Sequence, residues 1–440
     1  MPSPPSRSNT GPARPVRVAI DARRLREGLA GGVEQVVIGL AHGLSTLTDS
    51  PDEYLFLTTP PYDEWIAPYL SGGCRVLPSV GSSAWPTLRR RLAAKPALRT
   101  GWDRVRRALG RHAIRVPRSD GTIERAGAEA VHFPQQSAFL TAVPSLYQPH
   151  DLQHLHLPEY FTARARLSRE ITYRAFCSQA RTIVMMTRWG KEDITTHYDL
   201  PRTKVCVVPG ASVLDAYAEP TRADIDATRA RLALPEHFAF FPAQTFPHKN
   251  HLTLLEALAI ARDSLGITIP LVASGYQNEF FPRIAQRTSE LRLDSQVRFV
   301  GFVRPVELRA LYRLARCLVF PSRFEGWGLP VVEAFHEGTP VACAVATSLP
   351  EVVGDAALLF AADSPTEMAD RLVRLWEDEG LRSGLTARGR ERAAALSWTR
   401  SARIFRAHYR RIAGRQLGEE DSQLLKESCG NRESGIGNRE

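Results

Sequence analysis

Short runs of apolar residues recur along this 440-residue chain, and segments whose apolar positions repeat with helical spacing separate many of them. A strand of a parallel sheet reads as a continuous apolar run, because helices cover both faces of the sheet. The alternation therefore predicts strand–helix–strand units and a parallel sheet. In the first half of the chain the predicted strands are Val16–Ile20, Tyr54–Thr58, Arg75–Pro78, Ala130–Phe133, Ser145–Pro149, Thr182–Met186 and Val205–Val208.

A polar, charged helix predicted over Thr221–Leu232 interrupts this rhythm, which then starts again. A chain of this length has room for more than one domain. We therefore expect an α/β protein with two doubly wound domains, residues 16–215 and 236–395, whose strands end at a common cleft. The strands predicted in the second domain are Phe238–Phe241, Pro270–Ala273, Val297–Val300, Cys317–Phe320, Val341–Ala344 and Ala357–Phe360.

The two ends of the chain depart from this pattern. Residues 1–15 are polar and lack the apolar core of a signal peptide, so we expect a disordered leader. Helical patterns finish the fold, the last one over residues 396–415. From Gln416 the chain is polar and repeats the tetrapeptide GNRE, which predicts that residues 416–440 are disordered.

The net charge of +10 is concentrated in one segment. Ten arginines and Lys95 lie between Arg89 and Arg118, where Asp103 is the single acid. Tryptophans and leucines interleave with these cations over residues 85–118. Such a segment can lie on an anionic membrane surface or form a solvated basic loop, and the sequence leaves both open. Nucleic acid is not an expected partner, because no nucleic-acid-binding motif accompanies the charge.

The six cysteines are widely scattered and form no Cys-x-x-Cys pair. This spacing predicts buried, reduced thiols in a cytoplasmic protein. No uninterrupted apolar stretch reaches the roughly 18 residues of a membrane span. Peripheral attachment to the inner face of the cell membrane is the alternative that the basic segment leaves open.

The strongest candidate site follows the predicted strand Cys317–Phe320. A glycine-bearing turn comes next, and a helix opens at Pro330, where proline suits the first turn. The backbone N–H groups of Gly328 and Leu329 then lie at a helix N-terminus. Such a terminus favours a phosphate or a pyrophosphate.

Two carboxylates bracket this turn. Glu325 lies within it and Glu333 lies on the first turn of the helix. This arrangement would hold a nucleoside diphosphate with one acid near each end. The alternative is a helix whose positive end is merely stabilised by nearby acids.

A second loop, which follows the predicted strand Phe238–Phe241, carries Lys249 at the start of a helix. A lysine in that position would neutralise phosphate oxygens as a compact point charge, although a solvated surface lysine is the alternative. His150 ends a strand of the first domain, where it suits hydrogen bonding to a substrate or, alternatively, a place in the core. His154 and His156 follow it, but no further ligands with zinc spacing do, so we expect no metal site.

The pair Gly31-Gly32 opens the first predicted helix. The full Gly-x-Gly-x-x-Gly pattern of a dinucleotide fingerprint is not established here. Close approach of the backbone to a phosphate and an ordinary tight turn are equal alternatives.

These motifs together resemble the family 4 glycosyltransferases, which are retaining enzymes of the GT-B fold, and among them the bacterial O-antigen mannosyltransferases. The resemblance extends from Val16 to about Arg415, and its most specific parts are Phe324–Glu333, Pro242–Asn250 and His150–Phe161. It implies two Rossmann-like domains facing a cleft, with a C-terminal helix that returns to the first domain.

The resemblance also assigns roles. Glu325 would lie beside the donor sugar, as a nucleophile or as an orienting group, and His150 near the 6-position of that sugar. The other residues expected to bind the donor are Lys249 and Gln244 at the phosphates, Gly326, Trp327, Gly328 and Leu329 in the turn, Glu333 at the ribose, Phe302 beside the base and Gly32 at the diphosphate.

One position departs from the family pattern. Many members carry an arginine five or six residues before the phosphate lysine, whereas here Gln244 lies five residues before Lys249. Either Lys249 provides most of the neutralisation, or another cation such as Arg188 reaches the site.

The sequence thus predicts a retaining, metal-independent hexosyltransferase that needs no cofactor and uses a nucleoside diphosphate sugar as its donor. The expected acceptor is a glycan or a lipid-linked saccharide in the synthesis of a cell-surface polysaccharide such as lipopolysaccharide. A sugar-nucleotide epimerase and a non-catalytic protein that binds nucleotide sugars are the alternatives. The nucleotide, the sugar, the linkage and the oligomeric state stay open.

Overall fold

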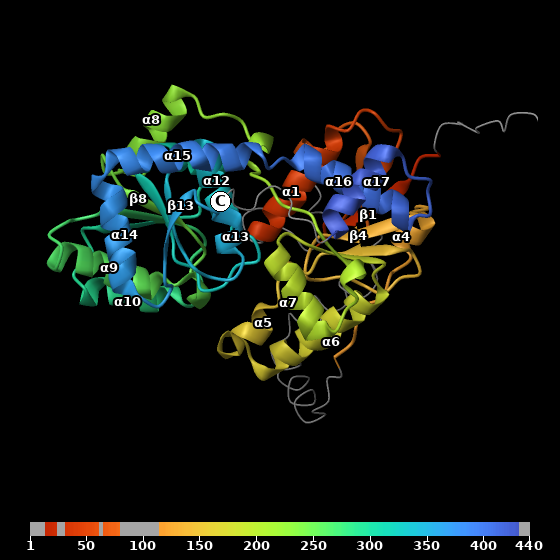
Figure 1. Ribbon diagram of the computed structural model, residues 1–440, viewed down its shortest axis with the longest axis horizontal. Helices are drawn as coiled ribbons and strands as arrows, with labels where there is room; N and C mark the ends of the chain where they lie inside the picture. The colour runs from red at the N-terminus through yellow and green to blue at the C-terminus, as the bar shows by residue number, and fades with distance from the viewer. Residues whose placement is uncertain (1–13, 24–30, 61–64, 80–113, 431–440) are drawn as a thin grey trace, which may run out of the picture.

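The computed structural model describes residues 14–23, 31–60, 65–79 and 114–430. Over these ranges the chain forms two parallel β-sheets with helices packed against them (Figure 1). The prediction of two doubly wound α/β domains is confirmed. Of the basic segment 85–118, residues 85–113 lie outside the described ranges.

The first sheet has seven strands in the order β3-β2-β1-β4-β5-β6-β7, all paired in parallel. The strand order reverses between β1 and β4, and open α/β sheets bind ligands outside the carboxyl ends at such a reversal. The strands are β1 (Arg17–Asp21), β2 (Glu53–Thr58), β3 (Cys74–Pro78), β4 (Ala130–Phe133), β5 (Ser145–Tyr147), β6 (Thr182–Met185) and β7 (Val205–Val207).

The second sheet repeats this arrangement with six strands in the order β10-β9-β8-β11-β12-β13. All of its pairs are parallel, and its order reverses between β8 and β11. The strands are β8 (Ala239–Pro242), β9 (Leu271–Ser274), β10 (Val297–Gly301), β11 (Cys317–Phe320), β12 (Val341–Ala344) and β13 (Ala357–Phe360).

Helices connect and cover the strands. In the first domain they are α1 (Gly32–Ser45), α4 (Thr122–Arg125), α5 (Gln153–His156), α6 (Ala163–Gln179) and α7 (Arg188–Tyr198). In the linker and the second domain they are α8 (Arg222–Arg231), α9 (His251–Asp263), α10 (Phe281–Glu290), α11 (Pro305–Leu314), α12 (Leu329–Glu337), α13 (Leu349–Val353), α14 (Pro365–Glu377) and α15 (Glu379–Ala394). Two more close the chain, α16 (Trp398–Ile412) and α17 (Glu419–Cys429).

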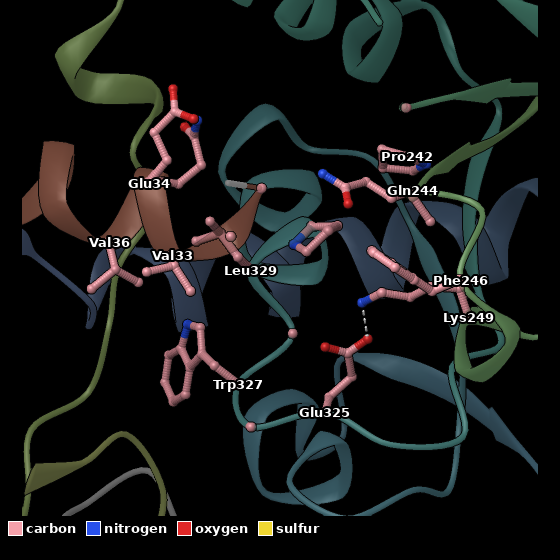
Figure 2. Close-up of a pocket in the computed structure, with 18 of the residues that line it drawn as sticks. Val33, Glu34, Val36, Pro242, Gln244, Phe246, Lys249, Glu325, Trp327 and Leu329 are labelled. Atoms are coloured by element: carbon pink, nitrogen blue, oxygen red, sulfur yellow. Dashed lines mark hydrogen bonds and ion pairs between the residues drawn. The ribbon is translucent and has the colours of Figure 1, made fainter. Parts of the chain in front are cut away.

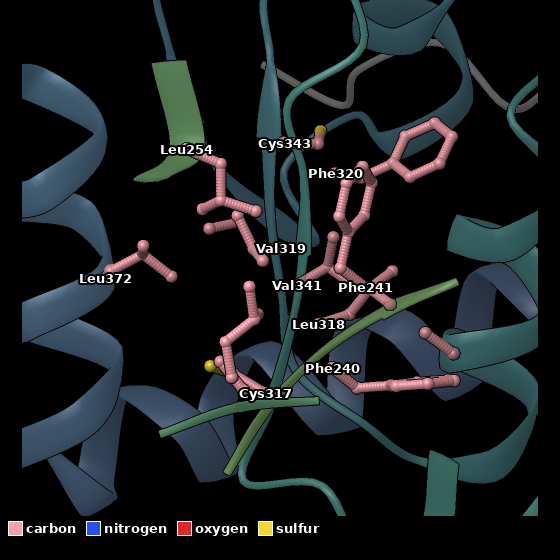
Figure 3. Close-up of a cluster of buried hydrophobic side chains, with 14 of the residues drawn as sticks. Phe240, Phe241, Leu254, Cys317, Leu318, Val319, Phe320, Val341, Cys343 and Leu372 are labelled. Atoms are coloured by element: carbon pink, nitrogen blue, oxygen red, sulfur yellow. The ribbon is translucent and has the colours of Figure 1, made fainter. Parts of the chain in front are cut away.

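The continuous apolar runs are strands buried on both faces. In β11, Val319 and Cys317 point toward helices α9 and α14, whereas Phe320 points to the opposite face (Figure 3). Alternate side chains of a strand face opposite sides of the sheet, so a strand between two helical layers needs apolar residues at every position. This requirement explains why single runs in the sequence located the strands.

The last helices tie the two domains together. Helix α15 packs against α12 of the second domain, and α16 then crosses to the first domain and packs against α1 (Figure 1). The expected return of the C-terminal helix is confirmed. The approach is close: a Cβ atom at Gly39 would lie 2.0 Å from the ring of Trp398, and one at Gly43 would lie 2.3 Å from the Trp398 carbonyl oxygen.

The expectation that the chain is disordered from Gln416 is wrong for residues 419–429, which form α17. The helix packs against α16, its Leu425 is buried, and Arg410 of α16 pairs with Asp421 at 2.9 Å. Cys429 is bonded to Cys206 of β7, so two of the six cysteines are not the reduced thiols that the spacing predicted. The other four are free and buried. Contacts with α16 and β7 thus stabilise this helix, although its own sequence is polar.

Among the helices described here, none combines the length and the apolar character needed to cross a bilayer.

Replacing Gly39 by alanine is expected to lower the midpoint of thermal unfolding, because the new methyl group would overlap the Trp398 ring and force α16 away from α1. Overpacking of this kind costs about 1–3 kcal/mol. Calorimetry of Gly39→Ala beside the matched control Gly384→Ala, inside α15, whose added methyl would lie an ordinary 3.7 Å from Arg388 Nη1, measures the effect. An unchanged midpoint for Gly39→Ala would contradict the tight packing of α1 on α16.

Candidate functional site

A cleft of about 450 Å³ lies between the two domains, at the carboxyl ends of their sheets. Its walls come from the N-terminus of α1, the loop after β5 and the loops after β8, β9, β10 and β11. Figure 2 shows Glu34 of α1 on one side of this space and Gln244 and Lys249 of the second domain on the other. Both reversal points of strand order therefore open into the same cleft.

The turn between β11 and α12 carries Glu325 into the cleft. Its backbone is held from the loop before α13: the Glu325 N–H donates to Thr347 Oγ1 at 2.9 Å, and Ser348 Oγ donates to the Glu325 carbonyl at 2.8 Å. Gly328 precedes α12 with φ +92°, a conformation that favours glycine. The helix N-terminus and the acid are thus fixed before any ligand binds.

Gly326 marks where this turn meets the first domain. A Cβ at this position would lie 2.6 Å from the carbonyl oxygen of His150, so only glycine lets the two backbones approach this closely. The following Trp327 is mostly buried, and its indole packs among first-domain residues such as Met186 and Val208. Gly326 and Trp327, predicted as donor contacts, also form the joint between the domains.

Lys249 reaches the turn from the loop after β8. Its Nζ lies 2.5 Å from Glu325 Oε1, and both side chains are largely buried (Figure 2). Asn250 supports this loop with a left-handed backbone, φ +66°, and its Nδ2 donates to the carbonyl oxygens of Pro321 and Ala362. The structure therefore aims the ammonium group at the turn through an asparagine that the sequence did not single out.

Glu333 is the fifth residue of α12, just past the first turn on which the sequence predicted it, and is only 4% exposed. Tyr312 Oη donates to Glu333 Oε2 at 2.7 Å. Burial outweighs this hydrogen bond and raises the pKa of Glu333 to about 7. Tyr312 thus holds one carboxylate oxygen of Glu333, and the Glu333 side chain lines the cleft.

His150 faces the turn from the first domain with a strained backbone, φ +71°. Its Nε2 donates to the Pro134 carbonyl at 2.9 Å, and burial lowers the pKa of His150. The ring is therefore neutral, with Nδ1 as a hydrogen-bond acceptor. Burial raises the pKa of the neighbouring Asp151, which also lines the cleft and which the sequence did not single out as a site residue.

The N-terminus of α1 supplies the opposite wall. Gly31 precedes the helix with φ +57°, and a Cβ there would lie 3.1 Å from Gln244 Nε2. Gln244 thus reaches across the cleft to the backbone beside Gly32. Phe302, in the loop after β10, is 57% exposed at the cleft edge.

All eleven residues that the sequence predicted line this cleft, although their roles stay predictions. Arg188 does not line it: its side chain lies 3.6 Å from Glu351, which also accepts from the backbone N–H groups at the start of α7. Lys249 is the one lysine or arginine among the described lining residues. Four carboxylates share the cleft with it, those of Glu34, Asp151, Glu325 and Glu333.

This geometry can bind a diphosphate. Two helix N-termini, of α1 and α12, and one buried ammonium group converge on it, each of which favours an anion. The described residues contain two groups of three potential metal ligands, and neither group lines the cleft. One group is His156, Asp193 and His197, and the other is Cys206, His408 and Cys429.

The fold and the site define a two-domain α/β protein that can bind a diphosphate ligand between its domains. Residues 224–392 match the family described as "Glycosyl transferases group 1". This match covers the second domain and agrees with the resemblance to the family 4, GT-B glycosyltransferases.

Individual relatives agree with this assignment. The chain is 27% identical to O-antigen chain mannosyltransferase B of Escherichia coli over 57% of its own length and 65% of that protein. It is 30% identical to D-inositol 3-phosphate glycosyltransferase of Corynebacterium glutamicum (strain R) over 53% of its length and 58% of that protein. The matched region thus spans less than two thirds of either relative.

The fold is shared by the solved sucrose-phosphate synthase of Thermosynechococcus elongatus, with a TM-score of 0.66 and 19% identity, covering 91% of this chain and 99% of that one. At that identity the likeness concerns the fold alone.

Replacing Glu333 by glutamine is expected to stabilise the protein at alkaline pH and to change little near pH 4.5. The folded-state pKa of about 7 lies above the ordinary 4.5, so the unfolded chain ionises first and stability falls as pH rises through that window. The loss amounts to at most about 3 kcal/mol, and glutamine escapes it. Urea unfolding of both proteins at several pH values measures the difference.

A constant difference between Glu333→Gln and the unsubstituted protein across this pH range would contradict the raised pKa. The comparison cancels all other titrating groups, because they are common to both proteins.

Proposed function

We propose that this protein is a retaining hexosyltransferase that transfers a hexose from a nucleoside diphosphate sugar to a hydroxyl group of a glycan or of a lipid-linked saccharide. The observation that carries the proposal is the Lys249–Glu325 pair beside the N-terminus of α12, with Glu333 one helical turn further on. Lys249 and the N-terminus of α12 would bind the diphosphate. Glu325 would lie beside the sugar at one end of it, and Glu333 beside the ribose at the other.

The barrier to such a transfer lies in the departure of the diphosphate, which gains negative charge as the anomeric carbon becomes oxocarbenium-like. Lys249 can exchange Glu325 for a phosphate oxygen, because the ion pair already holds its ammonium group in the cleft. A donor fixed in this way stabilises the transition state by about 3 kcal/mol, since no reorganisation is needed. The released Glu325 would then orient the sugar.

Retention follows in this scheme when the acceptor hydroxyl attacks from the face that the diphosphate leaves, with the diphosphate as the local base. His150, whose Nε2 donates to the Pro134 carbonyl, would accept a hydrogen bond from a sugar hydroxyl at Nδ1. Closure of the two domains about Gly326 would exclude water and limit hydrolysis.

Mannose is the sugar that the O-antigen relative suggests, and a cell-surface polysaccharide is the corresponding product. The name of the other relative points to a different acceptor, inositol phosphate. We place the enzyme in the cytoplasm, where it would act on an acceptor at the inner face of the cell membrane.

The proposal is tested by incubating the protein with guanosine, uridine and thymidine diphosphate sugars and measuring released nucleoside diphosphate. One donor is expected to be consumed, and Lys249→Met should lower its turnover at least 100-fold, the rough scale of losing one charge-stabilising group. Arg188→Met is the matched control, because that cation is held by Glu351 outside the cleft. Full turnover by Lys249→Met would refute the proposed role.

A non-catalytic binding protein is the second candidate, and the uncharged Gln244 opposite Gly31 favours it, since a single cation among the described lining residues then faces the diphosphate. The same incubation separates the candidates. A transferase releases the diphosphate, a binding protein shifts only its melting temperature, and an epimerase returns an isomeric nucleotide sugar.

The basic segment 85–118 leads us to propose binding to anionic membranes, in line with a lipid-linked acceptor. The protein is expected to float with vesicles containing phosphatidylglycerol at low salt and to dissociate at high salt, because the attraction is screened. Replacing Arg89, Arg90 and Arg91 by glutamine should weaken the binding, whereas neutral vesicles serve as the control. Equal binding of the triple variant and the unsubstituted protein to anionic vesicles would contradict the proposal.

A further inference from the structure

Two histidines and an aspartate of the first domain converge near the turn that carries Glu325, and none of the three lines the cleft. Asp193 and His197 lie one turn apart on α7, and His156 ends the short helix α5. His156 Nε2 lies 2.7 Å from Asp193 Oδ1, and His197 Nδ1 lies 3.1 Å from the same oxygen. One ligand atom from each of the three side chains lies within 4.8 Å of the others.

The carboxylate at the centre of this group is unusually placed. Asp193 is only 8% exposed, and its Oδ2 is buried without a hydrogen-bond partner among the described residues. A buried carboxylate oxygen without a partner is costly, and a bound cation would compensate for it. Both histidines lie at the surface, so one side of the group is open to solvent.

We propose that His156, Asp193 and His197 form a binding site for a divalent transition-metal ion of the zinc class. The ligands are His156 Nε2, His197 Nδ1 and the Asp193 carboxylate, and a water molecule completes a tetrahedral shell. Ligand atoms about 2.1 Å from a tetrahedral ion lie roughly 3.4 Å apart, so the exposed rings need to move outward by less than about 1 Å. At present both nitrogens donate to Asp193, His156 Nε2 to Oδ1 at 2.7 Å and His197 Nδ1 to the backbone carbonyl at 2.9 Å. Binding of the ion would replace these hydrogen bonds and move each proton to the other ring nitrogen.

The second group of potential ligands does not offer such a site. Cys206 and Cys429 are bonded to each other, and Arg411 donates to His408 Nδ1 at 3.1 Å. That guanidinium also lies 3.6 Å from Cys429 Sγ and would repel a cation. Near the proposed site, Arg174 donates to the backbone carbonyl of His197 at 3.3 Å, and its charge is paired with Glu170 at 3.1 Å.

A metal ion here would join α5 to α7 beside the catalytic turn. The His156 ring lies 5.2 Å from the ring of Phe324, the residue before Glu325, and 5.7 Å from that of Trp189. Helix α5 also begins three residues after His150. The ion would thus act as a positioning element for the first-domain side of the cleft, without touching the substrate.

The test uses the full chain, without a histidine tag and stripped of metal by a chelator. Isothermal titration with Zn²⁺ is expected to give one ion per chain, and Co²⁺ should give the intense visible absorption of a tetrahedral complex. Asp193→Asn and the double variant His156→Gln/His197→Gln should each weaken binding more than the roughly 10-fold typical of losing an outer-shell partner. Neither readout needs a sugar donor, so the result is independent of the transferase proposal.

Two controls make the outcome specific. His237→Gln removes an exposed histidine elsewhere and should bind the ion like the unsubstituted protein. Cys206→Ser/Cys429→Ser should also retain the site. The inference is overturned if the unsubstituted protein binds no Zn²⁺, if the histidine and aspartate variants bind as tightly as it does, or if only the cysteine variant loses the ion.

Discussion

The ion pair between Lys249 and Glu325 is the contact on which the cleft depends. Its partners are 76 residues apart in the chain and come from loops after two adjacent strands, β8 and β11. Parallel strands all end at the same edge of a sheet, so the loops that follow neighbouring strands must meet there. The pair therefore follows from topology, and it keeps an ammonium group beside a helix N-terminus in a largely buried place.

Burying these charged groups in the cleft lowers the stability of the fold. Four carboxylates face one lysine among the described lining residues, and burial raises the pKa of Glu333 and of Asp151. A core built for stability alone would not bury an acid on α12, since desolvation penalises its charged form. Strain at His150, φ +71°, points the same way. Costs of this kind cluster where a protein binds a ligand.

Glycine sets how the two domains meet. Gly326 allows the turn between β11 and α12 to touch the His150 backbone, and Gly39 and Gly43 allow α16 to lie against α1. The first contact joins the two domains at the cleft, and the second holds the end of the chain against the first domain. Both depend on the absence of a side chain, so neither produces an apolar or charged pattern that could be read as a contact.

The strands were predictable almost to the residue, because a strand covered on both faces must be apolar throughout and so appears as one run. The turn at Glu325 was predictable for a related reason: strand, glycine turn, proline and acid all lie within a few neighbouring positions. Helix α17 was missed, because its stability comes from Arg410, from the bond to Cys206 and from burial of a single leucine. Cys206 is 223 residues from Cys429 in the sequence, and the pairing of Asp421 with Arg410 depends on how α17 packs against α16.

Local pattern thus determined the two α/β domains, the helix starts and the identity of the residues at the strand ends. Tertiary structure alone decided which of them meet. It paired Lys249 with Glu325, held Arg188 outside the cleft against Glu351, and set Gln244 opposite Gly31. The physical reason is that propensity and periodicity act over a few residues, whereas the position of a charge depends on every element packed between its partners.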